Sequence, residues 1–314
     1  MREQEEKMLI RLLIILTPLI LGATEPITPI PQSLPYNGAK AALGKHLFFD
    51  TILSRDQTIA CVTCHDFQHG GADSRLVSIG VGGKMGRMQS PTVFNAVFNF
   101  TQFWNGRAKN LAEQAAGPVH NPVEMGMTTG QIEQRINADA RYRESFHTIT
   151  GRSIVTFADI AEMIAEYEKT LITPNGKFDR FLRGETVLTP NETQGYALFK
   201  RFGCVSCHNG INVGGNSFQK FGVIIPMQRT PNTDDRYALT GRERDKNVFK
   251  VPTLRNIALT APYFHNGSAA TLEEALRIMA KHNLGTKLTS LEINDIIAFL
   301  NTLSGQIPPK TITP

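Results

Sequence analysis

Two short cysteine–histidine motifs carry the strongest chemical signal in the sequence. They contain all four cysteines of the chain and read Cys61-Val-Thr-Cys64-His65 and Cys204-Val-Ser-Cys207-His208. Two thiols at this spacing can add to the two vinyl groups of one porphyrin while the adjacent histidine binds its iron, so the pattern is typical of c-type haem attachment. A thiol–disulfide motif, half of a zinc site or two disulfides are the alternatives. Because the motif occurs twice, the sequence predicts two covalently bound haem c groups.

The ligand on the other face of each iron decides what that iron can do. An iron with side-chain ligands on both faces transfers electrons, whereas an iron with one open face can bind a small molecule. Met279 is a candidate ligand for the haem of His208, because it lies downstream on an expected helix and carries a thioether sulfur. The alternative is an ordinary core methionine. The residues alone leave both interpretations open.

The elements around the two motifs form an internal repeat. Gly44-x-x-Leu47-Phe48 precedes the first motif and Gly195-x-x-Leu198-Phe199 precedes the second. Such self-similarity predicts two copies of one small helical domain. Capping boxes at Thr189–Glu192, Thr271–Glu274 and Thr289–Glu292 open further helices. The expected fold is therefore mainly α, with two cytochrome-c-like haem domains and long loops.

Apolar spacing and loop composition give the expected boundaries. Leu272, Ala275, Leu276 and Met279 form one predicted helix face, and Leu291, Ile296, Ile297 and Leu300 form another. We expect an N-terminal haem domain over residues 37–175 and a C-terminal haem domain over 176–305. Residues 24–36 are proline-rich and predict a linker, and residues 306–314 predict a tail. We expect the chain after Leu303 to fold back on the first domain.

The amino end predicts export. Residues 1–23 combine a charged start with an apolar stretch of about ten residues, which is typical of a signal peptide and short for a membrane span. An uncleaved anchor is the alternative. Export to the periplasm agrees with covalent haem attachment. The formal charge of +5 comes without a stripe of basic and aromatic residues, so nucleic-acid binding is not expected.

Longer strings resemble one protein family. They run in order from about residue 40 to 305 and include Ser90–Asn99, Gln102–Arg107, Leu111–Gln114, Asn121–Met125, Cys207–Gly210 and Leu259–His265. Together they are similar to the bacterial dihaem cytochrome c peroxidases. The resemblance implies two cytochrome-c-like domains, often in a homodimer, with a calcium ion between the haems. It also implies reduction of hydrogen peroxide to water with electrons from a small cytochrome c or a cupredoxin.

The resemblance also implies roles for single residues. His65 would be the proximal ligand of the peroxidatic iron, and His208 and Met279 the two ligands of the electron-entry iron. Trp104, the only tryptophan, matches an indole between the haems that assists electron passage. Glu124 matches the distal acid–base residue, and Gln114 matches its hydrogen-bonding companion.

The chain departs from the family pattern at two positions. Many members carry a distal histidine in a Ser-Ile-Gly-His string, but here the string is Ser78-Ile-Gly-Val81, and valine cannot bind iron. We expect an open peroxidatic haem; substitution by His69, Met85 or Met88 on the same loop is the alternative. The second departure is Gln89, where the family usually has an asparagine calcium ligand. Thr260 and Pro262 still match carbonyl donors of that site.

Two other functions compete with the peroxidase. One is a dihaem enzyme that oxidises an organic or protein substrate, as in relatives that mature tryptophan-derived quinones. Those relatives use tyrosine where this chain has Met279. The other is a pure electron-transfer cytochrome with both irons closed, which would leave Trp104, Gln114 and Glu124 without a task.

Overall fold

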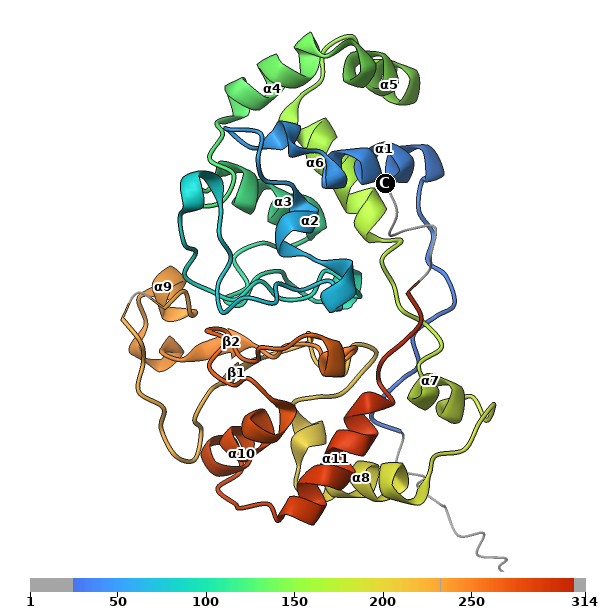
Figure 1. The fold of residues 1–314 in the computed structure, drawn as a ribbon, viewed down its shortest axis with the longest axis vertical. Helices are drawn as coiled ribbons and strands as arrows, with labels where there is room; N and C mark the ends of the chain where they lie inside the picture. Colours follow the sequence, from blue (N-terminus) through green and yellow to red (C-terminus); the bar gives the residue numbers. More distant parts are fainter. Residues whose placement is uncertain (1–24, 232, 308–314) are drawn as a thin grey trace, which may run out of the picture.

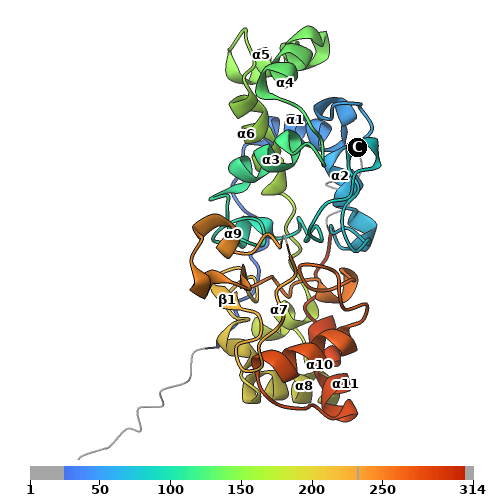
Figure 2. The same ribbon diagram turned by 90° about the vertical axis from the view of Figure 1, so that its left-hand side faces the viewer.

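The computed structural model describes residues 25–231 and 233–307 and consists mainly of helices. Two lobes lie end to end along the long axis (Figures 1 and 2). Each lobe has its own cluster of buried apolar side chains, so each contains a separate core. The mainly helical, two-domain prediction is therefore confirmed. The predicted signal peptide, residues 1–23, lies outside the described residues.

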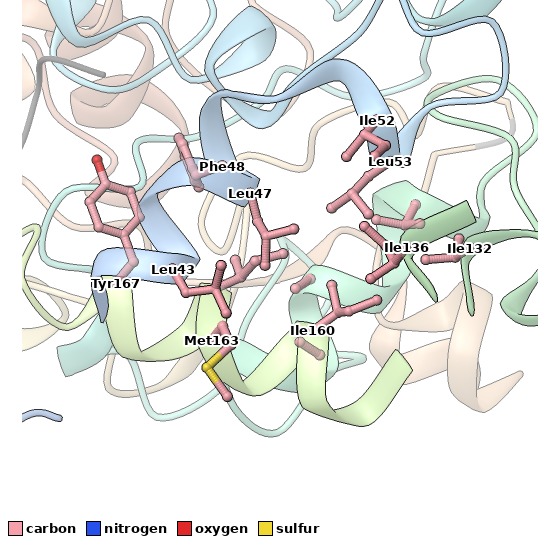
Figure 3. Close-up of a cluster of buried hydrophobic side chains, with 14 of the residues drawn as sticks. Leu43, Leu47, Phe48, Ile52, Leu53, Ile132, Ile136, Ile160, Met163 and Tyr167 are labelled. Carbon is pink, nitrogen blue, oxygen red and sulfur yellow. The ribbon is translucent and has the colours of Figure 1, made fainter. Parts of the chain in front are cut away.

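The N-terminal domain is built around two packed helices. Its helices are α1 (Gly38–Phe49), α2 (Cys61–Cys64), α3 (Leu111–His120), α4 (Thr129–Ala138), α5 (Ala140–Thr150) and α6 (Phe157–Glu168). Figure 3 shows Leu43 and Leu47 of α1 against Ile160 and Met163 of α6, with α4 closing the cluster. The motif helix α2 follows α1, so the core fixes where the first haem motif lies.

The C-terminal domain repeats this plan. Its helices are α7 (Lys177–Leu182), α8 (Pro190–Arg201), α9 (Tyr237–Thr240), α10 (Leu272–Asn283) and α11 (Ser290–Asn301). A two-stranded antiparallel sheet pairs β1 (Phe218–Lys220) with β2 (Val248–Lys250), and Phe218 lies opposite Lys250. The three predicted capping boxes are confirmed at the starts of α8, α10 and α11.

The repeated glycine marks a helix crossing in each domain. A Cβ atom on Gly44 would overlap the carbonyl oxygen of Met163 in α6, and one on Gly195 would overlap that of Asp295 in α11. Only glycine allows the backbones to approach this closely. The Leu-Phe pair that follows each glycine is buried in its core. The repeat Gly-x-x-Leu-Phe is therefore a helix-packing motif.

Both ends of the described chain pack on the opposite domain. Ile27, within the predicted linker, is buried in the C-terminal core and forms an isolated bridge with Gly210. The guanidinium of Arg255 donates to the Thr28 carbonyl at 2.9 Å and to Asp179 at 2.6 Å. Ile307 packs against the N-terminal core, in agreement with the expected fold-back, and residues 308–314 of the predicted tail lie outside the described residues. The segment before α1 is thus a packed connection.

One predicted helix face is wrong in part. In α11, Ile296 and Leu300 are buried as expected, but the Leu291 side chain is 70% exposed and Ile293 is buried instead. The crossing with α8 is centred at Asp295, more than one turn later, so the first turn extends past the contact. Over the described ranges there is no helix long and apolar enough to cross a membrane.

Candidate functional site

One cavity of about 1010 Å³ extends across both domains. This volume is at the upper end of the range for small-molecule and cofactor sites. Every site residue predicted from the sequence lies on its wall: Cys61, Cys64, His65, Gln89, Trp104, Gln114, Glu124, Cys204, Cys207, His208, Thr260, Pro262 and Met279. The fold therefore brings together residues that are up to 218 positions apart (from Cys61 to Met279).

The two Cys-x-x-Cys-His motifs present their side chains as haem attachment requires. None of the four cysteines is in a disulfide. The Nδ1 atom of His65 lies 3.2 Å from the Gly71 carbonyl oxygen, and that of His208 lies 3.4 Å from the Val213 carbonyl oxygen. Burial lowers the pKa of both imidazoles, that of His208 to about 4. Both rings are therefore neutral, with Nε2 available to bind a metal, so the residues present fit haem c.

A second repeat, not recognised from the sequence, positions the other walls. Residues 91–111 and 252–272 share Pro-Thr-x-x-Asn, Phe-x-Asn-Gly and a leucine at a constant offset. Both copies have left-handed backbone at the asparagine and the phenylalanine, and both contain an antiparallel bridge, Gln102 with Ala108 and Tyr263 with Ala269. The copies end at the first residues of α3 and α10, Leu111 and Leu272. The two repeated strings are visible in the sequence and could have revealed this equivalence.

This repeat makes Met279 of α10 equivalent to Pro118 of α3. Each is the eighth residue of its helix, and each lies on the cavity wall. All four residues of the predicted face Leu272, Ala275, Leu276 and Met279 also line the cavity. A thioether can bind iron and a proline side chain cannot. The two halves of the cavity therefore differ at the same position of the fold.

The part of the cavity wall that the N-terminal domain forms (its N-terminal half) carries no thioether ligand at this position but has a carboxyl group and an amide nearby. Glu124 follows α3, and its Oε1 accepts a hydrogen bond from Asn121 Nδ2 at 2.6 Å. Burial raises the pKa of Glu124, while the Asn121 amide and the Arg107 guanidinium lower it. Gln114 projects from α3 on the same cavity wall. These groups can exchange a proton and donate a hydrogen bond to a small bound molecule.

Trp104 lies between the domains. Its Nε1 donates to the Gln89 carbonyl at 2.8 Å, and its own carbonyl accepts from the Lys250 N–H at 2.7 Å. Its ring makes edge contacts with the rings of Phe249 and His265, with centroids 6.4 and 6.3 Å away. The indole is therefore held by both domains beside both halves of the cavity.

Comparison with known proteins agrees with this geometry. The family model for di-haem cytochrome c peroxidase matches residues 38–187, and the model for cytochrome c matches residues 193–304. The chain is 47% identical to a cytochrome c551 peroxidase of Nitrosomonas europaea over 92% of this chain and 87% of that protein. It belongs to the di-haem cytochrome c peroxidase family.

Other relatives lie in the same family. Identity is 42% with the cytochrome c551 peroxidase of Pseudomonas aeruginosa, over 89% of this chain and 84% of that one. It is 44% with the cytochrome c peroxidase Ccp of Escherichia coli, of which this chain spans 62%. Among solved structures, a MauG-like protein associated with microbial copper homeostasis is 28% identical with a TM-score of 0.81, covering 94% of this chain and 98% of that chain.

Val81 occupies the position at which the family resemblance leads one to expect a distal histidine. Val81 is fully buried, and its N–H donates to the Glu124 carbonyl at 2.8 Å. Of the three alternative ligands, His69 is bonded to Asp66 and Met85 is exposed, and neither lines the cavity. Met88 does line it. Of the three alternative ligands, Met88 is therefore the one that reaches the cavity.

Two buried ionisable residues on the cavity wall were missed in the sequence. Glu168 ends α6, and its Oε2 is buried without a hydrogen-bond partner; burial raises its pKa to about 8. Lys250 ends β2, and burial lowers its pKa to about 8. No local pattern distinguishes either residue from a surface charge, because their burial depends on the packing of distant segments.

Proposed function

We propose that this di-haem protein reduces hydrogen peroxide to water with electrons from a small cytochrome c or cupredoxin. The observation that carries the proposal is the difference between the two halves of the cavity. Met279 faces the C-terminal half, while Pro118, Gln114 and Glu124 border the N-terminal half. A closed iron suits electron entry and an open one suits peroxide. The bound haems supply the redox chemistry of the reaction.

The side chains of the N-terminal half supply the proton transfers. Conversion of one hydrogen peroxide to two waters takes up two electrons and two protons. The Glu124 carboxylate accepts a proton from one peroxide oxygen and returns it to the other, which leaves as water. The Gln114 amide orients the peroxide by a hydrogen bond without changing its own charge. The Asn121 amide holds the Glu124 carboxyl in place.

A turnover assay with hydrogen peroxide and reduced cytochrome c tests the proposal. Oxidation of two cytochromes per peroxide is expected. Failure to oxidise the donor would contradict the peroxidase. The two alternative functions would then be an oxidase of an organic or protein substrate and a pure electron-transfer cytochrome. The ferric protein should also show a high-spin signal from the N-terminal haem. If a wholly low-spin spectrum gains a high-spin signal in Met88→Leu, then Met88 is the ligand and the open site is wrong.

The same family membership supports a calcium ion between the domains. Gln89, Thr260 and Pro262 line the cavity together, and the Gln89 NH₂ group donates to the Asp73 carbonyl at 3.0 Å, which leaves its amide oxygen for a cation. Oxygen donors of this kind suit calcium. Within the described residues no group of three or more His, Cys, Asp or Glu side chains could hold a metal. The donors that the resemblance implies, the Gln89 amide oxygen and the Thr260 and Pro262 carbonyls, are all neutral oxygens.

We further propose that the protein acts in the periplasm as a homodimer. The signal-like features of residues 1–23 and the two covalent haem motifs support export. Detection of the haem-loaded protein in a periplasmic extract tests the location. Light scattering on the haem-loaded protein tests the oligomeric state, and a monomer mass at micromolar concentration would contradict the dimer.

A further inference from the structure

Lys250 is a buried cation in the wall of the cavity. Lys250 is the last residue of β2, and only 6% of its surface is exposed. Among the residues that the structure describes, it has no ion-pair partner. Desolvation is the only effect that shifts its pKa, so no nearby carboxylate compensates its charge. An isolated buried ammonium group is costly, so a site like this one requires an anion.

Haem propionates are the anions that occupation of this cavity would bring to Lys250. Each haem c carries two propionate groups, and the cavity wall contains both haem attachment motifs. The buried carboxylates Asp179 and Asp235 are already paired with Arg255 and Arg229. Glu168 has no ion-pair partner among the described residues, but its raised pKa leaves it largely uncharged at neutral pH. Lys250 is therefore the buried cation left to pair with a group inside the cavity.

The position of Lys250 indicates which haem it serves. Lys250 is followed by Val251 and Pro252, and the backbone of Pro252 is within hydrogen-bonding reach of the His208 ring. In the first domain Gln89 occupies the equivalent place, two residues before Pro91, whose backbone is near the His65 ring. Lys250 therefore belongs to the segment that reaches the His208 ring, whereas the equivalent position in the segment that reaches the His65 ring is a neutral amide.

We propose that Lys250 binds a propionate of the C-terminal haem from within the domain interface. This inference rests on the proposed occupancy of the cavity by two haems. Pairing with a cation cancels the negative charge of the propionate, which otherwise favours ferric iron. Lys250 therefore raises the potential of the electron-entry haem. The backbone N–H of Lys250 also donates to the backbone carbonyl of Trp104 at 2.7 Å, so the two residues are neighbours across the domain interface.

The test is a spectroelectrochemical titration of both haems in Lys250→Met. Met preserves the volume and removes the charge. We expect the C-terminal haem of the variant to lose at least about tenfold of its preference for the ferrous state, which is a downward shift of 59 mV for a one-electron couple. Lys250→Arg should keep the wild-type potential. Lys287→Met removes an exposed charge of the same domain and should also leave the potential unchanged.

The pH dependence provides an independent readout. Without Lys250 the buried propionate has a raised pKa and takes up a proton in the neutral range. The potential of Lys250→Met should therefore approach the wild-type value at acid pH and fall as the pH rises, while the wild type stays flat. An unchanged potential at every pH, or a shift confined to the N-terminal haem, would overturn the inference. Because no step requires peroxide, this result is independent of turnover.

Discussion

Two glutamates border the same cavity, but their surroundings give them different properties. Glu124 has a hydrogen bond from Asn121 and the Arg107 guanidinium nearby, both of which oppose the effect of burial on its pKa. Glu168 has neither, and burial alone raises its pKa to about 8. At neutral pH Glu168 is therefore largely protonated, and Glu124 is the better proton acceptor. Different surroundings of two acids commonly separate their roles.

Glu124→Gln tests the proton transfer. The amide preserves the shape and the bond to Asn121 but cannot accept a proton, so peroxide turnover should fall by about 10²–10⁴-fold. Reduction of the C-terminal haem by the donor should be unaffected. In the wild type, kcat/KM for peroxide should fall as the pH drops through the raised pKa of Glu124, because the base is then protonated. Glu144→Gln, at an exposed position of the same domain, is the control.

Glu168→Gln should stabilise the haem-loaded protein. The pKa of Glu168 is raised on folding from 4.5 to about 8, so the folded state binds the extra proton and its stability falls as the pH rises from about 4.5 through 8. The variant lacks this penalty. Its free energy of unfolding should equal that of the wild type at acid pH and exceed it at alkaline pH, by at most about 5 kcal/mol.

Urea unfolding at several pH values measures this difference. Glu162→Gln changes an exposed residue of the same helix, which pairs with Lys40 at the surface. It should cost at most about 1 kcal/mol and show no gain at alkaline pH. Equal pH profiles for both variants would contradict the assigned burial of Glu168.

At the scale of elements, a glycine at one position sets the distance between two helices in each domain. Gly195 of α8 lies against the backbone of Asp295 in α11. Gly195→Ala would force these helices apart, and we expect a loss of about 3 kcal/mol in the free energy of unfolding. Gly130→Ala is the control, since a Cβ atom there meets nothing within 4 Å. Thermal unfolding should separate the two variants clearly; similar melting temperatures would argue against the crossing.

Local patterns in the sequence predicted the elements well. The Cys-x-x-Cys-His motifs and the three capping boxes depend on neighbours within a few residues, and all lie where expected. Leu291 fits the spacing of an apolar face but is exposed, because helical spacing does not reveal where a partner helix ends. The segment around Ile27 has the composition of a linker, and only the tertiary structure shows that it is buried.

The site was predictable only with the help of a family resemblance. Residue types alone give no reason to place Gln114, Glu124 and Met279 on one cavity wall, because α3 and α10 belong to different domains. The repeat of Pro-Thr-x-x-Asn and Phe-x-Asn-Gly contains the missing information in the sequence. It aligns Pro118 with Met279 and thereby reveals the difference between the two halves.

At the scale of the whole molecule, the interface between the domains contains both Trp104 and the residues of the proposed calcium site. Electron transfer between the haems and calcium binding should therefore depend on the same contact between the domains. Thr260, Pro262 and Trp104 line the same cavity. Removal of calcium by a chelator should therefore disturb the surroundings of Trp104 and slow turnover with donor and peroxide. Gln89→Ala should weaken calcium binding by roughly tenfold, or about 1.4 kcal/mol. Calorimetric titration of the chelated protein measures this. Gln68→Ala, an exposed glutamine, should bind calcium as the wild type does.

The crossed packing of the chain ends constrains how the protein is made. Ile27 completes the core of the domain that is synthesised last, and Ile307 contacts the core of the domain that is synthesised first. Neither lobe has its full set of contacts until the whole polypeptide has emerged. Attempts to produce the halves separately by division near residue 176 should therefore yield two fragments, each lacking a segment that the other fragment carries.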